Sequence, residues 1–278
     1  GLFTAVCFLD IAKCFPSIDH EILLYKLDWY GVRGNENMWF KNYLSHRSQT
    51  VRVNGTYSET LPVKLGVPQG SVLGPTLFLI YVNDLVQHTS NCSCSMFADD
   101  AMAYNVGATP DEAIGKLQEG LATMEVWYRD NRLCTNAIKS KWMMMCSSKK
   151  SPTHSITPNL SGQPLQNVAC YKQLGILLDS NLNWSDHTKG IVKQVTGKLY
   201  VLKQLRKCMP KSLAINIYLS CIQPHLEYAA TIWGPFIPKD SNPIQKLQNR
   251  AARIITNNYD FVNIRGIEIV SNLGWETF

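Results

Sequence analysis

Apolar positions along the chain follow two spacings: the short runs typical of strands and the three- to four-residue repeat typical of amphipathic helices. Residues 5–11 form an apolar run that ends in an acid, and two short strand-like runs, 94–98 and 101–105, flank another pair of acids. Helical spacing extends over residues 19–30 and again over 186–207. The pattern therefore predicts both strands and helices, with acids placed where strands end.

The predicted elements change in character along the chain. They are a strand at 5–11, helices at 19–30 and 36–44, a hairpin at 48–53 and 58–65, a helix to about 85, strands at 94–98 and 101–105, a helix at 109–131, strands at 141–146 and 168–178, and helices at 186–207, 211–222 and 242–257. The polar stretch 148–164 is expected to be a loop or a loose hairpin. We predict an α+β domain followed by a helical one, with a boundary near 180–185.

Composition and charge place the chain among ordinary globular proteins. It has 278 residues, of which 45% are hydrophobic and 17% charged, and its apolar runs are far shorter than the ~20 residues of a membrane span. Residues 1–180 carry 15 Lys and Arg against 15 Asp and Glu, whereas residues 181–278 carry 12 against 6. A basic segment attached to a neutral one suggests a polyanionic partner, most simply nucleic acid, and no membrane partner.

Nine cysteines occur without any Cys-x-x-Cys pair. We interpret them as reduced, mostly buried small hydrophobic residues of an intracellular protein, and we do not expect a zinc site.

Phe97-Ala98-Asp99-Asp100 is the sharpest local feature, because two adjacent acids sit between two apolar strands. A solvated Asp-Asp turn is one interpretation, and a Mg²⁺ site is the other, since hard cations prefer carboxylate oxygens. Asp10, at the end of the first predicted strand, strengthens the second. Two-metal phosphoryl transfer needs acids from separate elements, so Asp10 and Asp99 are the expected ligands of both ions, with Asp100 as a third.

The segments around these acids resemble the reverse transcriptase of a non-LTR (LINE-type) retrotransposon of the jockey-like group. FLDIAKCF at 8–15 is similar to the first palm motif, although Cys14 and Pro16 depart from its usual Ala and Asp. The resemblance makes Asp10 a catalytic acid and Phe15 the aromatic gate that rejects a ribose 2′-hydroxyl. Without the motif, Phe15 would be interpreted as a core residue.

Three further segments resemble later motifs of the same family. GVPQGSVLGP at 66–75 is similar to the second motif, which implies that Gln69 and Gly70 contact the nucleotide; a loop leading into a helix capped by Ser71 would explain it equally well. FADD at 97–100 resembles the third motif, so Asp99 and Asp100 join Asp10 as catalytic residues. In the fourth, at 127–141, Lys139 is either the general acid that protonates pyrophosphate or a surface lysine.

The remainder resembles a primer grip at 168–180 and a helical thumb. The resemblance implies a polymerase palm with an antiparallel sheet and packed helices at 1–182 and a basic thumb at 183–278. The fingers are expected to be missing, because only nine residues precede Asp10. Trp184, Tyr200 and Trp233 are expected in the core. Basic residues spaced along the first thumb helix would contact phosphates of a template–primer duplex: Lys189, Lys193, Lys198, Lys203, Arg206 and Lys207.

The implied activity is RNA-directed DNA polymerisation with two Mg²⁺ ions, or Mn²⁺, on an RNA template with a DNA primer or target DNA and dNTPs. The implied location is the nucleus and a cytoplasmic ribonucleoprotein. Without fingers, the isolated chain is expected to be inactive or weak. The alternatives are an inactive nucleic-acid-binding remnant of a truncated element and another palm polymerase, such as an intron maturase or a retron enzyme.

Overall fold

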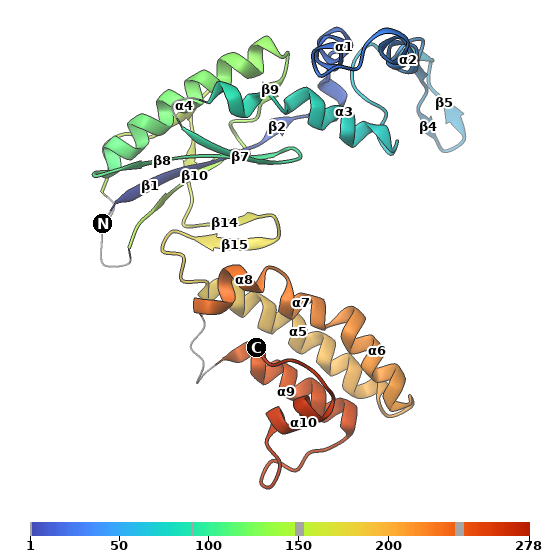
Figure 1. The fold of residues 1–278 in the computed structure, drawn as a ribbon, viewed down its shortest axis with the longest axis vertical. Coiled ribbons are helices and arrows are strands. Elements are labelled where there is room, and N and C mark those ends of the chain that lie inside the picture. Colours follow the sequence, from blue (N-terminus) through green and yellow to red (C-terminus); the bar gives the residue numbers. More distant parts are fainter. Residues whose placement is uncertain (1, 90–91, 148–152, 237–241) are drawn as a thin grey trace. The chain divides into compact units, whose positions relative to one another are not determined.

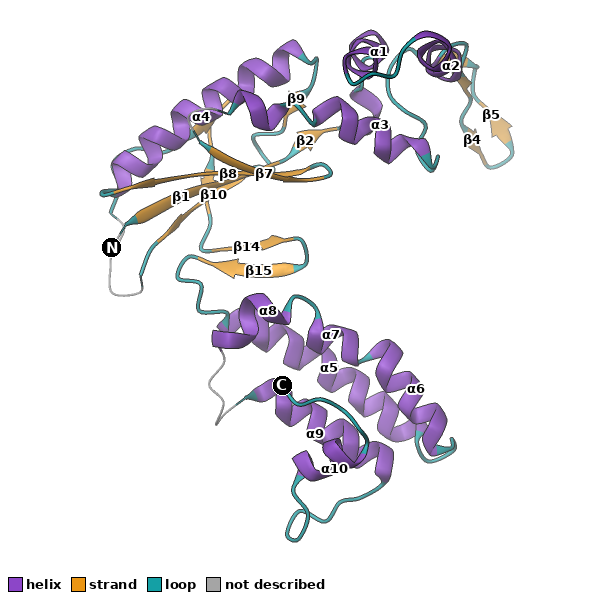
Figure 2. Cartoon of the chain, in the orientation of Figure 1, coloured by secondary structure: helices purple, strands orange, loops and turns teal. Residues whose placement is uncertain are grey.

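The computed structural model describes residues 2–89, 92–147, 153–236 and 242–278. The chain forms two compact units, Gly1–Ala169 and Cys170–Phe278. Strands and helices are mixed in the first unit, and helices dominate the second, as Figures 1 and 2 show. The predicted mixture of strands and helices is confirmed.

A five-stranded sheet in the order β13-β10-β1-β8-β7 organises the first unit. Its strands are β1 (Phe3–Leu9), β7 (Ser93–Phe97), β8 (Asp100–Gly107), β10 (Lys141–Met145) and β13 (Gln166–Asn167). β1 is the central strand and is buried along most of its length, as its unbroken apolar run predicts. Helix α4 (Pro110–Asp130) packs against β8 and β1 (Figure 2).

The prediction of an antiparallel sheet is wrong at one edge. β1 pairs antiparallel with β8 and β10, and β7 pairs antiparallel with β8, but β13 runs parallel to β10. A parallel pair needs a long connection so that the chain can return in the same direction. Here about twenty residues join the two strands, and they include a small hairpin of β11 (Asn159–Leu160) and β12 (Gln163–Pro164). The stretch 148–164, predicted to be a loop or a loose hairpin, contains this hairpin, and its residues 148–152 lie outside the described residues.

The remaining elements of the first unit are short. They are β2 (Ile11–Ala12) paired with β9 (Cys134–Thr135), a 3-10 turn η1 (Phe15–Ser17), α1 (His20–Trp29), α2 (Gly34–Leu44), β3 (Ser48–Gln49) paired with β6 (Leu61–Pro62), β4 (Arg52–Val53) paired with β5 (Thr56–Tyr57), α3 (Leu73–Val82) and η2 (Leu85–His88). Asn54 and Gly55 have φ of +49° and +86°, the turn that the Asn-Gly pair predicts.

The second unit begins with a hairpin of β14 (Cys170–Gln173) and β15 (Ile176–Asp179). Its helices are α5 (Ser185–Leu205), α6 (Lys211–Cys221), α7 (Gln223–Glu227), α8 (Ala230–Trp233), α9 (Pro243–Thr256) and α10 (Gly266–Asn272), with the 3-10 turn η3 (Gly234–Phe236). The Tyr228 hydroxyl donates to the carbonyl of Leu174 at the hairpin tip, over 2.6 Å. The hairpin thus belongs structurally with the helices, although the sequence grouped it with the preceding domain.

Several side chains do not lie where the sequence predicted. Trp184 and Trp233 are buried as expected, but Tyr200 is 61% exposed on α5, so its assignment to the core is wrong. The nine cysteines are free, as predicted, but only Cys7 and Cys14 are buried. Spacing alone could not separate the buried stripe of α5 from the positions beside it.

Asp19 joins the start of α1 to the segment that follows α4. Its carboxylate caps α1 by accepting from the backbone N–H groups of Glu21 and Ile22, and it pairs with Arg132, which follows α4. Burial alone would raise the pKa of Asp19, but these hydrogen bonds and the guanidinium outweigh it and lower the pKa. The pairing with Arg132 therefore adds a tie across the fold to the helix cap.

We expect Asp19→Asn to lower the free energy of unfolding by about 1–2 kcal/mol at pH 7, because a capping and ion-pairing charge is lost. The folded-state pKa lies below the unfolded value of about 4, so this stabilisation is present above pH ~4 and is lost as the pH falls through the folded-state pKa. Urea unfolding of both proteins from pH 3 to 7 measures the difference. Asp28→Asn, on the exposed side of α1, is the control; a difference that does not change with pH would contradict the assignment.

Candidate active site

The three predicted acids lie at one edge of the five-stranded sheet. Leu9 pairs with Ala101, so the next residue, Asp10, follows β1 beside the start of β8 at Asp100. Asp99 lies in the turn between β7 and β8. Burial raises the pKa of Asp100, and the negative charges of Asp99 and Asp10 raise it further. The strand register thus gathers three carboxylates that come from places 90 residues apart in the sequence.

The acidic turn has an unusual backbone. Phe97 pairs with Asp100, which leaves Ala98 and Asp99 as the two turn residues, and Ala98 has a φ of +53°. A non-glycine residue in this region costs of order 1 kcal/mol and persists only where its surroundings enforce it. Because two-residue hairpin turns use positive φ, this backbone is compatible with both a solvated turn and a metal site.

The donor set suits a hard divalent cation, since carboxylate oxygens are what Mg²⁺ and Mn²⁺ prefer. Asp99 and Asp100 are exposed, and Asp10 is half-buried, which leaves their oxygens accessible. Within the described ranges, no group of three His, Cys, Asp or Glu side chains is close enough to form a complete metal site. The thiol of Cys14, 3.6 Å from Asp99 Oδ2, donates a weak hydrogen bond to one of the three acids.

A turn from the fourth motif holds the backbone of Asp10 on both sides. The Asp10 N–H donates to the hydroxyl of Ser140 over 3.0 Å, and the Asn136 N–H donates to the Asp10 carbonyl over 2.8 Å. Ser140 is fully buried, and its own N–H closes the turn onto the Asn136 carbonyl. Lys139 lies in the same turn with an exposed side chain. The sequence singled out Lys139 but missed Ser140, because its role depends on a contact 130 residues away.

The first and second motifs meet through backbone at Gly66. The Val67 N–H donates to the Phe15 carbonyl over 3.1 Å, and the Gly66 N–H donates to the Ile18 carbonyl over 2.7 Å. A Cβ on Gly66 would lie 2.7 Å from the Cα of Pro16, and Gly66 has a φ of +84°. Pro16 itself stands in the first turn of η1, where a helix needs no N–H. Glycine is thus required at this junction.

Phe15 and Gln69 lie on the two sides of this junction. The half-buried ring of Phe15 packs on Phe78 with ring centroids 4.8 Å apart. Phe15 therefore also contributes to the hydrophobic core of the first unit. Gln69 and Gly70 are exposed just before α3, and Gln69 lines a cavity of about 640 Å³ with Pro16 and Arg47. The Ser71 hydroxyl accepts from the N–H of Gly74 in the first turn of α3, although the N-cap residue of this helix is Val72 and not the predicted Ser71.

The six basic residues predicted to contact nucleic acid divide into two groups. Lys189 pairs with Asp186 on the surface, Lys198 donates to the Cys221 carbonyl and contacts His225, and Arg206 donates to the carbonyls of Ile255 and Met209. Exposed ammonium groups remain on Lys193, Lys203 and Lys207. Part of the predicted basic face therefore has a structural role within the second unit.

Residues 3–185 match the reverse transcriptase (RNA-dependent DNA polymerase) family. This chain belongs to that family. It is 32% identical over 267 residues to the probable RNA-directed DNA polymerase from transposon BS of Drosophila melanogaster, a match that covers 90% of the chain and 28% of that protein. It is 30% identical over 272 residues to the RNA-directed DNA polymerase from the mobile element jockey of the same species, covering 94% and 29%.

These relatives confirm the predicted relationship to jockey-type non-LTR reverse transcriptases. The chain spans less than a third of their length. Among solved structures, it is similar to telomerase from Candida albicans bound to a fragment of telomeric RNA, with a TM-score of 0.46, 12% identity, and coverage of 99% of this chain and 51% of that one. In the part of this reverse transcriptase chain that the structure describes, no helix is both long and apolar enough to span a bilayer.

Proposed function

We propose that this chain forms the catalytic part of an RNA-directed DNA polymerase of a non-LTR retrotransposon, which extends a primer 3′-hydroxyl with dNTPs on an RNA template. The observation that carries the proposal is the register of β1 on β8, which brings Asp10, Asp99 and Asp100 to one edge of the sheet. Target DNA would supply the primer. The work would take place in the nucleus, with a cytoplasmic ribonucleoprotein as the assembled form.

Asp10 and Asp99 would hold both divalent ions, with Asp100 as a third ligand. When bound, two Mg²⁺ ions, or Mn²⁺, supply activation of the primer hydroxyl and neutralise the charge on the leaving pyrophosphate. Asp10 presents its carboxylate from a backbone held by Ser140 and Asn136, so little reorganisation is needed before reaction. The exposed Lys139 of the same turn would give a proton to pyrophosphate.

Phe15, Gln69 and Gly70 would form the nucleotide side of the site. Because the Phe15 ring rests on Phe78, it cannot easily retreat, and a fixed ring is what exclusion of a ribose 2′-hydroxyl requires. Gly70 has a φ of +80° and no neighbour within 4 Å of a Cβ position, which leaves room for a nucleotide against the backbone. Lys189, Lys193, Lys198, Lys203, Arg206 and Lys207 would contact phosphates of the template–primer duplex, although several are partly engaged already.

Incorporation of labelled dNTP on a primed RNA template tests the proposal. The assay uses the 278-residue chain and a chimaera in which the preceding segment of the jockey polymerase is joined to it. We expect the chimaera to make product that needs Mg²⁺ and disappears with EDTA, and the chain alone to make little or none. A chimaera that is folded and binds the primed template, yet makes no product, would favour the alternative of an inactive nucleic-acid-binding remnant.

Ser140 offers a sharper test of how Asp10 is positioned. Ser140→Ala leaves the Asp10 N–H without its acceptor, which we expect to cost about 1–2 kcal/mol of stability and to reduce incorporation roughly tenfold. A purely structural role would leave the Mg²⁺ concentration for half-maximal rate unchanged, whereas a displaced Asp10 raises it. Ser140→Thr retains the hydroxyl and is expected to restore the Mg²⁺ dependence; no shift in that dependence for Ser140→Ala would rule out the positioning role.

A further inference from the structure

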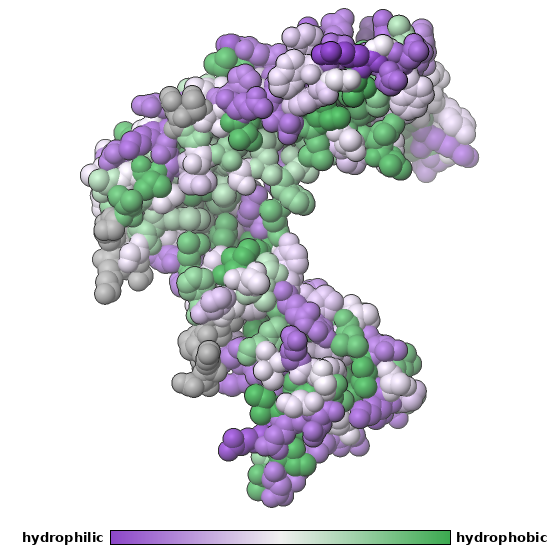
Figure 3. Space-filling view, in the orientation of Figure 1, coloured by the Kyte–Doolittle hydropathy of each residue, from purple (hydrophilic) through white to green (hydrophobic). Residues whose placement is uncertain are grey.

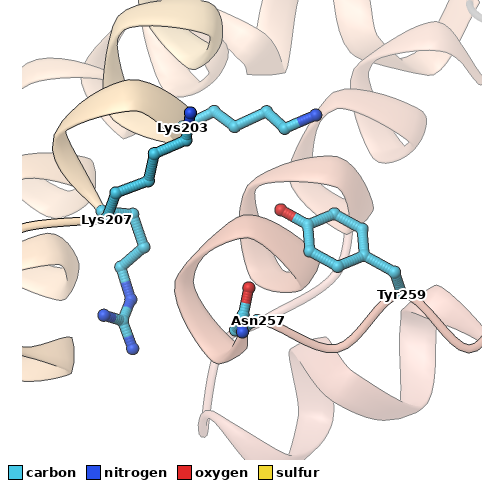
Figure 4. A pocket seen from close by; sticks show the side chains of 5 residues that line it. Lys203, Lys207, Asn257 and Tyr259 are labelled. Atoms are coloured by element: carbon cyan, nitrogen blue, oxygen red, sulfur yellow. The ribbon is translucent and has the colours of Figure 1, made fainter.

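Two adjoining cavities in the second unit lie beside the loop between α9 and α10. Their volumes are about 590 and 560 Å³, and Lys203 and Tyr259 line both. Six basic residues line the pair, and the described residues that line them include no Asp or Glu: Lys203, Arg206, Lys207, Lys246, Arg250 and Arg253. In Figure 4 the Lys203 side chain reaches from α5 toward Tyr259. The cavities form one cationic groove.

Two of the six basic side chains donate hydrogen bonds within the fold, and the other four do not. Arg206 donates to backbone carbonyls of Ile255 and Met209, and the buried Arg253 donates to those of Asp260 and Ile264. Arg206 thus satisfies a carbonyl in the last turn of α9, and Arg253 satisfies carbonyls of the loop between α9 and α10.

The other four, Lys203, Lys207, Lys246 and Arg250, are exposed. Within the described ranges, no side chain of these four forms a hydrogen bond or an ion pair. Their charge is therefore available to a ligand.

The loop beside the groove presents aromatic rings to solvent. Tyr259 is 43% exposed and Phe261 is 72% exposed. Each ring has a cation nearby: Lys203 Nζ lies 5.7 Å from the Tyr259 centroid, and the Arg253 guanidinium lies 4.4 Å from that of Phe261. Figure 3 shows hydrophobic side chains beside hydrophilic ones over this loop.

The loop that carries these rings is held in place. The Asp260 carboxylate accepts from the N–H groups of Val262 and Asn263, and Arg253 anchors the loop's carbonyls from α9. A carboxylate that could repel phosphate is thus occupied within its own turn. Exposed rings on a fixed loop lose little entropy when a ligand stacks on them.

We propose that this groove binds an unpaired nucleic acid strand, with a base stacked on Tyr259 and phosphates on Lys203, Lys207, Lys246 and Arg250. Exposed rings alternating with free cations match the chemistry of a single strand, whose bases offer their faces. In a duplex those faces are already stacked on each other. The proposal rests on the proposed function for the strand's role, as unpaired template or displaced DNA, while the binding itself depends only on this groove.

Fluorescence anisotropy of the full chain with a 12-nucleotide strand containing 2-aminopurine tests the inference. It is measured in EDTA, so that binding is separated from metal-dependent synthesis. RNA and DNA forms distinguish the two sources of strand, and a duplex of the same sequence is the comparison. We expect Tyr259→Ala to weaken single-strand binding about tenfold, to abolish the stacking quench of 2-aminopurine, and to leave duplex binding unchanged.

Matched variants separate this groove from general surface effects. Tyr200→Ala removes an exposed tyrosine of α5 that does not line the groove, and it should bind like the wild type. Lys207→Ala should lower the affinity for the single strand and reduce the slope of log affinity against log salt by about 0.7. Lys211→Ala, outside the groove, should lower that affinity less. Wild-type affinity and quenching in Tyr259→Ala would overturn the proposal and leave the aromatic loop as a protein-contact surface, whether or not the chain polymerises.

Discussion

The double substitution Asp99→Asn, Asp100→Asn is expected to reduce DNA synthesis by the chimaera by about three orders of magnitude or more. The proposed chemistry depends on positioning and neutralising charge through bound cations, and amide oxygens carry no charge with which to hold them. Both acids are exposed, and their mutual repulsion is removed, so the stability of the fold should change by no more than about 0.5 kcal/mol. Loss of synthesis without loss of stability is the expected signature.

The measurement pairs incorporation on primed RNA with urea unfolding and template–primer binding. Asp130→Asn is the control, since Asp130 is an exposed acid that pairs with Arg129 at the end of α4. Synthesis above a tenth of the wild-type rate in the double variant would show that these carboxylates are not the metal ligands. Loss of template binding together with synthesis would instead point to a general effect on the surface.

Gly66→Ala is expected to destabilise the first unit by roughly 2–5 kcal/mol. The strain of an alanine at φ +84° adds to overpacking, because the new Cβ would lie 2.7 Å from the Cα and 2.8 Å from the carbonyl oxygen of Pro16. Those atoms are backbone and cannot rotate away. The clash would push the second motif away from the first, so the rate of dNTP incorporation should also fall.

Urea unfolding at pH 7 measures the change. Gly31→Ala is the matched control, since Gly31 has a φ of +96° but nothing within 4 Å of the Cβ position, so only the strain of about 1–2 kcal/mol applies. Equal losses in the two variants would mean that the contact with Pro16 does not matter. A larger loss for Gly66→Ala measures the closeness of the two motifs.

Local sequence signals predicted local structure well. Helix α4 forms where a helix was predicted at 109–131, and Thr109 caps it by accepting from the Glu112 N–H, with Pro110 in the first turn. The Asn54-Gly55 hairpin also forms. Each of these features depends on residues within four positions of one another, which is the range over which single-sequence patterns carry information.

Long-range features could not be predicted in this way. The parallel edge strand β13, the exposure of Tyr200 and the contact of Ser140 with Asp10 each depend on which distant segment packs beside the residue. The acids were found because motifs marked them. No motif identified Tyr259 or Ser140, and a sequence does not show which of its tyrosines are exposed or which of its serines are buried.

The hydrogen bonds around Asp10 constrain the length of a segment more than its composition. Of the two hydrogen bonds that hold Asp10 to the turn 136–140, one uses the Ser140 side chain and the other joins backbone groups of Asn136 and Asp10. The residues at 137 and 138 can therefore vary among related elements while the carboxylate stays in place, whereas Lys139 is constrained by its proposed role as a proton donor. One inserted or deleted residue between Thr135 and Ser140 would shift the register of β10 against β1 and move Asp10 away from its neighbours. Among copies of related elements that have lost activity, small insertions and deletions in this turn should therefore indicate inactivity more reliably than substitutions at 137 and 138.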